Sequence, residues 1–203
     1  MGVSSFAKNR HIIGNKVIFV AYDVCHVPKY HEWMKSPSLQ YLTASEPLTL
    51  AEEFDMQRKW VNDTNKCTFI VLDKQKFEAT NDEVNSMIGD TNVYFSNEND
   101  LSVGEIELMI AEKNERGKGK GKEVLALMMR FAHDVIGVKI FEAKIKMDNA
   151  SSLRLFASFH FVETEKSPIF NEITMTFNTN NEADLRFLRN QSDFIRYNLI
   201  SSQ

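Results

Sequence analysis

The chain has few cysteines and no long apolar run. Its 203 residues include only Cys25 and Cys67, too few for a framework of disulfides. No stretch approaches the length of about 18 apolar residues that a membrane-spanning helix needs. The first residues, MGVSSFAKNR, lack the apolar segment of a signal peptide. We therefore expect a cytoplasmic protein with no membrane association.

A strong charge of either sign is also missing. The formal net charge is −4, and this argues against general nucleic-acid binding. Residues 113–122 form one basic island, but no second stretch of similar density accompanies it, so polyanion binding is kept only as an alternative. His26 and His31 have no further His or Cys at ligand spacing, and we expect no metal site. The length suits one large domain with an appendage.

Glycine is scarce, yet three of the eight glycines stand at alternate positions, 117, 119 and 121. A predicted strand from Gly104 precedes them and an amphipathic helix follows. Glycine takes backbone angles that other residues resist and leaves the main chain open to a ligand. The N–H groups at the start of a helix attract anions. We therefore expect a site for a phosphate or pyrophosphate, to which nearby cations add charge: Arg116, Lys118, Lys120 and Lys122.

The glycine spacing excludes two common phosphate-binding motifs. A P-loop needs Gly, four residues and then Gly-Lys, but the residues five before Gly121 and Gly119 are Arg116 and Asn114. The dinucleotide fingerprint needs G-x-G-x-x-G, whereas this chain has G-x-G-x-G. The remaining pattern is Arg-x-x-Gly-x-Gly. A flexible lysine-glycine linker is the alternative, although the patterned flanks argue against it.

Apolar periodicity predicts an α/β (α+β) fold in which helices flank a mixed sheet that is mainly antiparallel in its first half. Strands are expected at 16–22, 67–73, 87–95 with a bulge at Gly89, from 104, at 140–146 and at 169–177. Helices are expected at 27–35, where Pro28 can begin a helix, and at 50–61, where Thr49 and Glu52 form a capping-box signature. Two more are expected, one from the glycine turn to Gly137 and one ending near His160. Residues 42–48 and 74–85 are expected to be loops. Residues 178–203 read as a polar tail with a loosely packed helix marked by Leu185, Leu188, Ile195 and Leu199.

The Arg-x-x-Gly-x-Gly turn between a strand and a helix resembles the acyl-CoA loop of the GNAT superfamily of N-acetyltransferases. The segments HEWMKS, LTASEPLTL, KCTFIVLD, GEIELMIAE and FEAKI resemble its N-acetyltransferase 9-like branch. The resemblance covers residues 12–177, which would form the GNAT domain, and leaves 178–203 as a C-terminal tail. It implies a GNAT-like mixed, mainly antiparallel sheet flanked by helices.

A second motif adds to the resemblance. Asn149, Ser152, Phe156 and Phe161 fall where GNAT proteins carry Asn, a small hydroxyl residue, Tyr and the Phe of Gly-Phe. Two residues depart from that pattern, since Phe156 replaces the tyrosine and His160 replaces the glycine.

The resemblance implies transfer of an acetyl group from acetyl-CoA to an amine by direct attack. The pyrophosphate would lie on main-chain N–H groups of residues 116–122, and the pantetheine arm would follow residues 108–110. A backbone N–H near Leu108 or Met109 would stabilise the negative charge on the carbonyl oxygen. The residues implied in binding acetyl-CoA are Leu108, Met109, Ile110, Arg116, Gly117, Lys118, Gly119, Lys120, Gly121, Lys122, Asn149, Ser152 and Phe156.

Two carboxylates are candidates for the catalytic base. Glu105 and Glu107 share one face of the strand because side chains alternate along it. Glu105 is the first choice because it lies further from the phosphate end, and the alternative is that both acids pair with neighbouring lysines or main-chain N–H groups. Phe156 cannot protonate the departing thiolate, but a thiol with a pKa of about 8.5 leaves tolerably near neutral pH.

The acceptor is expected to be a protein or peptide amine. An α-amine has a pKa near about 8 and loses its proton more easily than a lysine amine, whose pKa is about 10.4. An N-terminal amine is therefore favoured, with the segments 42–48 and 163–169 expected to be loops that flank the chain. The alternative function is a catalytically inert GNAT-fold module that binds acetyl-CoA or a protein.

Overall fold

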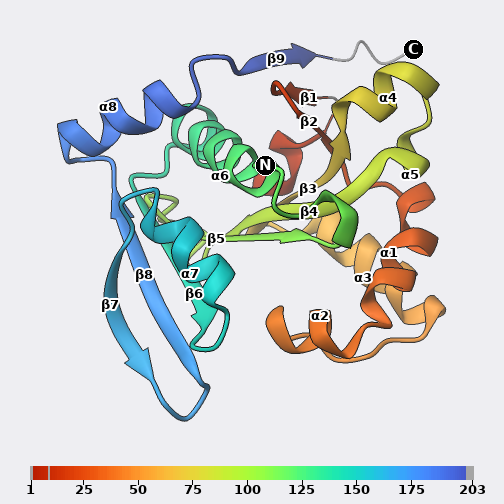
Figure 1. Cartoon of the computed structure of the whole chain (residues 1–203), viewed down its shortest axis with the longest axis horizontal. Coiled ribbons are helices and arrows are strands. Elements are labelled where there is room, and N and C mark those ends of the chain that lie inside the picture. The colour runs from red at the N-terminus through yellow and green to blue at the C-terminus, as the bar shows by residue number, and fades with distance from the viewer. Residues whose placement is uncertain (1, 9, 200–203) are drawn as a thin grey trace.

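A mixed sheet of nine strands forms the centre of the computed structural model, which describes residues 2–8 and 10–199 (Figure 1). Its order is β7-β8-β6-β5-β4-β3-β2-β1-β9. Neighbouring strands β5 and β6 are parallel, and the other neighbours pair antiparallel. The strands are β1 (Arg10–Ile13), β2 (Val17–Ala21), β3 (Lys66–Asp73), β4 (Met87–Tyr94), β5 (Val103–Ile110), β6 (Ile140–Lys146), β7 (Val162–Ser167), β8 (Glu172–Asn178) and β9 (Arg196–Leu199).

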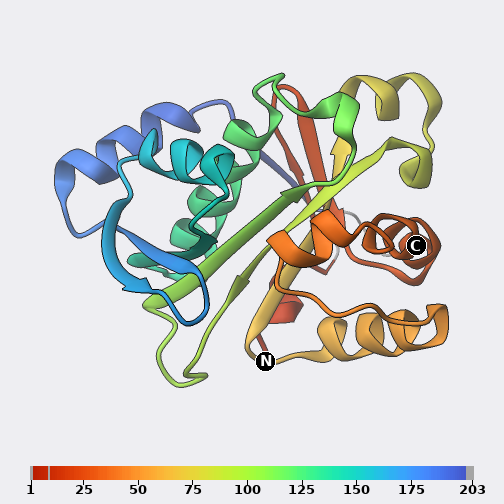
Figure 2. The same ribbon diagram turned by 60° about the horizontal axis from the view of Figure 1, so that its bottom comes forward.

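Helices cover both faces of this sheet. They are α1 (Val27–Met34), α2 (Pro37–Leu42), α3 (Leu50–Asn62), α4 (Lys74–Thr80), α5 (Glu83–Ser86), α6 (Lys120–Phe131), α7 (Ala150–Ala157) and α8 (Glu182–Gln191). Shorter helical turns are η1 (Val3–Phe6), η2 (Val24–His26), η3 (Lys113–Glu115) and the π-helical η4 (Ala132–Ile136). Figure 2 shows α6, α7 and α8 on one side of the sheet and α1, α2 and α3 on the other. The predicted sheet flanked by helices is confirmed.

The inner strand β3 is buried on both faces, which explains its largely apolar sequence. Phe69 and Val71 pack into the core beneath α6, whereas Ile70 and Leu72 pack into the core beneath α1 and α3. Alternate side chains point to opposite faces of a strand, so this one segment joins two hydrophobic cores. It thereby holds the helical layers in a defined relation to each other.

Local signals set several helix ends as predicted. Thr49 and Glu52 form a capping box at the start of α3, and Pro28 lies in the first turn of α1. Gly137 follows η4 in the left-handed conformation, with φ 99°. The predicted bulge is also present, because the β3–β4 register skips Ile88 beside Gly89.

Two predicted loops are wrong because regular structure occupies them. Residues 74–85 contain α4 and α5, each begun by an aspartate, Asp73 or Asp82, that accepts a backbone N–H bond. Residues 163–169 lie mostly in β7, whose polar sequence VETEKS carries no apolar alternation to signal a strand. Polar edge strands and short capped helices escape a search for apolar periodicity because packing contributes little to them.

The C-terminal segment from residue 178 packs against the rest of the molecule and does not extend away from it as a tail. In α8 the side chain of Leu188 is fully buried in the core beneath α6. Beyond α8, β9 pairs antiparallel with β1 at the far edge of the sheet. The helix predicted for this segment is therefore right at Leu185 and Leu188 and wrong at Ile195 and Leu199, which lie outside it. The division of the chain at residue 178 stays a prediction.

Among the described residues, no helix is both long and apolar enough to cross a lipid bilayer.

Candidate active site

A cleft opens where the two parallel strands of the sheet diverge. The ladder between β5 and β6 ends at the pair Glu105–Glu142, although β5 continues to Ile110 and β6 to Lys146. The diverging ends leave main-chain groups of β5 without a sheet partner on that side. A cavity of about 600 Å³ lies here, lined by both strands, by α7 and by the glycine turn.

The glycine turn lies at one end of this cleft. Two of its glycines have a backbone conformation that favours glycine, whereas the third leaves space in the cleft. Gly117 and Gly119 have φ values of 73° and 79°, in the left-handed region that glycine adopts without strain, and Gly119 caps α6. Gly121 has no positive φ, and a Cβ there would meet only Leu155 and Ile110 at ordinary distances of 3.7 and 3.8 Å. Because Gly121 lines the cleft, a side chain would occupy space that a bound molecule could use.

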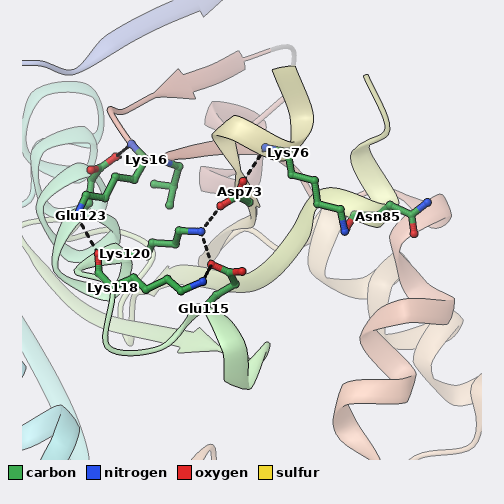
Figure 3. A network of polar contacts seen from close by, with 9 residues as sticks. Lys16, Asp73, Lys76, Asn85, Glu115, Lys118, Lys120 and Glu123 are labelled. Atoms are coloured by element: carbon green, nitrogen blue, oxygen red, sulfur yellow. Dashed lines mark hydrogen bonds and ion pairs between the residues drawn. The ribbon is translucent and has the colours of Figure 1, made fainter. Parts of the chain in front are cut away.

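An ion triad of Lys120, Asp73 and Glu115 stabilises the glycine turn (Figure 3). The buried ammonium of Lys120 lies between the carboxylates of Asp73 and Glu115, and Lys118 also pairs with Glu115 at 3.1 Å. The Lys120 hydrogen bond holds the pKa of Glu115 below its usual value. At Asp73 burial raises the pKa, but hydrogen bonds from Lys120 and a backbone N–H outweigh burial and leave it lowered. These lysines therefore hold the turn, and their charge is largely neutralised within it.

Two further contacts tie the turn to the sheet. The Arg116 guanidinium donates to the carbonyls of Ile110 and Ala111, at 2.7 and 3.1 Å, so it closes the loop onto the end of β5. On the other side, Glu123 Oε1 accepts the backbone N–H of Lys16 at 2.7 Å. The turn is thus held in place by contacts that do not use the N–H groups of Gly117 and Gly121.

The cleft brings together most of the residues predicted to bind acetyl-CoA. Those that line it are Leu108, Met109, Ile110, Arg116, Gly117, Gly121, Asn149, Ser152 and Phe156. Four do not line it: Lys118, Gly119, Lys120 and Lys122. Asn149 caps α7, accepting the N–H of Ser152 at 3.1 Å.

The cleft also carries several charged side chains. Both predicted acids, Glu105 and Glu107, line it, and Glu105 Oε2 lies 2.6 Å from the Lys144 ammonium. The side chains of Lys146 and Glu172 form a second pair at 2.9 Å. Glu105 is thus paired with a neighbouring lysine, as the alternative predicts for both acids, but among the described residues this pairing is found for Glu105 and not for Glu107.

The lining residues that the sequence analysis missed include Tyr30, Lys66, Asp90 and Asn92. Asp90 is a buried carboxylate, and burial raises its pKa to about 7. Asn92 is also buried, and its Oδ1 has no hydrogen-bond partner. A signal was present in β4, since Asp90 and Asn92 are two residues apart and therefore share one face of the strand, although Thr91 between them is also polar.

At the rim of the cleft, α2 contacts the β7–β8 hairpin. Residues 42–45 line the cleft, as expected for part of the predicted loop 42–48. The Tyr41 hydroxyl donates to Asp148 Oδ2 at 3.0 Å and accepts from the Asn171 amide at 2.9 Å. Two segments far apart in the sequence are therefore bridged beside the cleft.

The two departures from the GNAT pattern have local explanations. Phe156 is buried and packs edge-on against Phe161, with ring centroids 4.9 Å apart. His160 has a φ of 64°, a left-handed value at the position where GNAT proteins carry glycine. The centroids of the His160 and Phe187 rings are 3.9 Å apart, and His160 Nδ1 lies 3.2 Å from Asp184 Oδ1. Two residues of α8 therefore contact the His160 side chain in this conformation.

A cluster of Cys25, His26 and Glu83 has the composition of a metal site, but its hydrogen bonds oppose that role. His26 Nδ1 accepts the backbone N–H of Asp23 at 3.0 Å, so the ring proton lies on Nε2, which faces Glu83 at 3.3 Å. Both ring nitrogens are therefore engaged. Burial and the neighbouring carboxylates also raise the pKa of the Cys25 thiol, which disfavours the thiolate that a metal binds.

Comparison with known proteins decides the family. The family described as "Acetyltransferase (GNAT) domain" matches residues 16–162, more than half of the chain. The chain belongs to the GNAT acetyltransferase family. It is 50% identical over 175 residues to an N-acetyltransferase 9-like protein of Nematostella vectensis, covering 86% of this chain and 88% of that one. It is also 44% identical over 191 residues to the alpha/beta-tubulin-N-acetyltransferase 9 of Homo sapiens, covering 93% and 92%.

The solved structures agree on the fold. The spermidine N-acetyltransferase of Vibrio cholerae, in complex with CoA and spermine, superposes with a TM-score of 0.71 at 15% identity, covering 84% of this chain and 99% of that one. The predicted GNAT membership and its N-acetyltransferase 9-like branch are confirmed. The chain is an N-acetyltransferase.

Proposed function

We propose that this GNAT enzyme transfers the acetyl group of acetyl-CoA to an N-terminal α-amine of a protein or peptide. The observation that carries the proposal is the cleft between β5 and β6, which ends at the glycine turn and the start of α6. Backbone N–H groups of residues 116–122 would bind the pyrophosphate, since a helix start attracts anions. The bound acetyl-CoA supplies an activated thioester.

The β5 main chain would hold the reacting end of acetyl-CoA. Residues 108–110 lie on the part of β5 that has no ladder contact with β6, so their main-chain groups are open to an extended pantetheine arm. An N–H of Leu108 or Met109 would donate to the carbonyl oxygen as negative charge develops on it. Removing one donor of this kind has cost about 10²–10³ in rate in other enzymes.

A protein acceptor is supported by two observations. Relatives are named for acetylation of tubulin, so tubulin chains are the first acceptors to test. The rim formed by residues 42–45 and the β7–β8 hairpin leaves the acceptor end of the cleft bordered on two sides. An α-amine suits the reaction because a larger fraction of it is neutral near pH 7 than of a lysine amine.

Acetyl transfer to defined acceptors tests this proposal. Labelled acetyl-CoA is incubated with tubulin N-terminal peptides, with the same peptides blocked at the α-amine, and separately with polyamines and amino sugars. We expect label only on the unblocked peptides. Label confined to polyamines or amino sugars would overturn the protein acceptor, and binding of acetyl-CoA without any transfer would identify the inert module instead. The cytoplasmic location and the absence of nucleic-acid binding stay predictions.

A further inference from the structure

The middle of β4 places a carboxylate opposite the proposed reaction centre. The β4–β5 register pairs Asp90 with Met109 and Asn92 with Glu107. Directly opposed residues of antiparallel strands have Cα atoms about 4.5–5.5 Å apart. Asp90 and Met109 both line the cleft, so the carboxylate stands next to the main chain proposed to hold the acetyl carbonyl.

Two other acids of the cleft, Glu105 and Glu107, lie further from Met109. Successive residues of a strand are about 3.4 Å apart, so Glu107 lies about 7 Å and Glu105 about 14 Å along β5 from Met109. Glu105 is also bound to Lys144. A base must reach the proton it removes directly or through one water, and this requirement favours Asp90.

The surroundings of Asp90 suit a group that exchanges a proton near neutral pH. It is 5% exposed, and burial raises its pKa to about 7. From β3 the Lys66 ammonium lowers that pKa, from β5 Glu107 raises it, and from α1 a hydrogen bond of Tyr30 lowers it. Tyr22, directly after β2, also lies near Asp90, and Glu53 of α3 lies near Tyr22 and Tyr30.

Asn92 offers a second acceptor beside Asp90. It stands two residues further along β4, on the same face, and its exposed fraction is 4%. Its Oδ1 has no hydrogen-bond partner, which is a costly arrangement for a buried oxygen unless a ligand completes it. A primary ammonium has three N–H donors and could satisfy both side chains.

We propose that Asp90 is the general base of the reaction and that the amide oxygen of Asn92 positions the acceptor amine beside it. This inference rests on the proposed function. The acceptor's –NH3+ gives one proton to the Asp90 carboxylate, and the amine lone pair then attacks the thioester carbon. The C–N bond forms, a second proton passes from the nitrogen to water, and the C–S bond breaks. The thiolate takes a proton from water, because Phe156 has none to give, and Asp90 releases its own, so the net products are amide, thiol and one proton.

The test is the single-turnover rate of peptide acetylation between pH 5.5 and 9.5, with acetyl-CoA affinity measured alongside by calorimetry. Asp90→Asn has the shape of the protonated side chain and is expected to fold. We expect the rate at pH 7 to fall by about 10²–10⁴, the range for a lost general base, with acetyl-CoA affinity changed less than threefold. Asp193→Asn, at an exposed position outside the cleft, is the matched control for removing one carboxylate.

Variants of the groups around Asp90 test whether its titration controls the rate. If Asp90 had only a structural role, these variants would not shift the pH midpoint of the rate. The wild-type rate is expected to rise with pH through a midpoint near 7. Lys66→Met and Tyr30→Phe should move that midpoint upward, and Glu107→Gln should move it downward, because each removes a group that shifts the pKa of Asp90. In Asp90→Asn only the rise due to the acceptor amine, near about pH 8, should remain.

The outcomes separate the inference from the function on which it rests. If Asp90→Asn keeps the wild-type rate and midpoint, Asp90 is not the base. If instead Glu105→Gln or Glu107→Gln abolishes the rise near pH 7 while Asp90→Asn keeps it, that glutamate is the base. A wild-type protein that binds acetyl-CoA but acetylates no peptide would overturn the proposed function itself. Asn92→Leu should raise the acceptor KM more than it changes the midpoint, and an unchanged KM would remove Asn92 from the site.

Discussion

At the scale of single residues, Gly121 borders the cleft without a conformational reason to be glycine. Its Cβ position is open apart from ordinary contacts with Leu155 and Ile110. We expect Gly121→Val to weaken acetyl-CoA binding at least about tenfold, because the branched side chain would stand where the phosphates approach the main chain. Calorimetry measures the affinity, and thermal unfolding confirms that the variant is folded.

Gly121→Ala serves as the graded control, since alanine is a better helix former than glycine and adds only one carbon. An intermediate affinity is expected. If the folded Gly121→Val variant bound acetyl-CoA as the wild type does, the pyrophosphate would have to lie elsewhere.

Phe156 tests whether the thiolate leaves unassisted. Because the wild type has no hydroxyl at this position, Phe156→Tyr should keep or raise the single-turnover rate. Phe156→Ala should instead act through packing, since the ring is buried against Phe161. Its free energy of unfolding should fall by about 3–5 kcal/mol. A large loss of rate in a stable Phe156→Tyr variant would contradict this prediction and show that a hydroxyl at this position hinders the reaction.

At the scale of elements, the start of α6 depends on contacts from the end of β3. Lys120 joins Asp73 to Glu115, and removing the ammonium would leave two carboxylates close together in a largely buried place. We expect Lys120→Met to lower the free energy of unfolding by about 1–3 kcal/mol. Urea unfolding at pH 7 measures the change.

The same triad predicts a pH dependence. The Asp73 and Glu115 pKa values lie below their ordinary 3.8 and 4.5, so the stabilisation is present above those ordinary values and is lost as pH falls through the lowered ones. The stability difference between wild type and Lys120→Met should therefore shrink between pH 5 and about pH 3. A difference that stayed constant over this range would show that the carboxylates do not carry the effect.

At the scale of the whole molecule, the C-terminal segment closes the structure over α6. Leu188 of α8 is fully buried, and β9 completes the sheet beside β1. We expect Leu188→Ala to lower the free energy of unfolding by about 2–5 kcal/mol, as for a buried leucine whose removal leaves a cavity. Leu185→Ala is the matched control at a half-buried position on the same helix and should cost less. Equal effects of the two would mean that α8 does not dock through Leu188.

The molecule also shows where prediction from sequence succeeds. The glycine turn, the capping box at Thr49 and Glu52 and the apolar stripe of α6 are local patterns, and each was predicted because a few neighbouring residues determine it. The GNAT fold followed from the turn and from the order of elements. The polar edge strand β7 and the strand β9 were not predicted, since pairing with a distant strand decides them.

The sequence by itself determined the family, the order of most helices and strands along the chain and the place of the glycine turn, because those depend on spacing and on local backbone preference. Only the tertiary structure decided which charges are available in the cleft. The sequence suggests that Lys120 is a cation available to phosphate, but its ammonium forms ion pairs with Asp73 and Glu115. The sequence likewise suggests that Glu105 is an unpaired acid, but its carboxylate forms an ion pair with Lys144. Asp90 reads as one polar residue in a strand, yet the β4–β5 register sets it opposite Met109 and burial raises its pKa. The physical reason is that a side chain's charge and partners depend on residues distant in the chain, which only the folded sheet brings within reach.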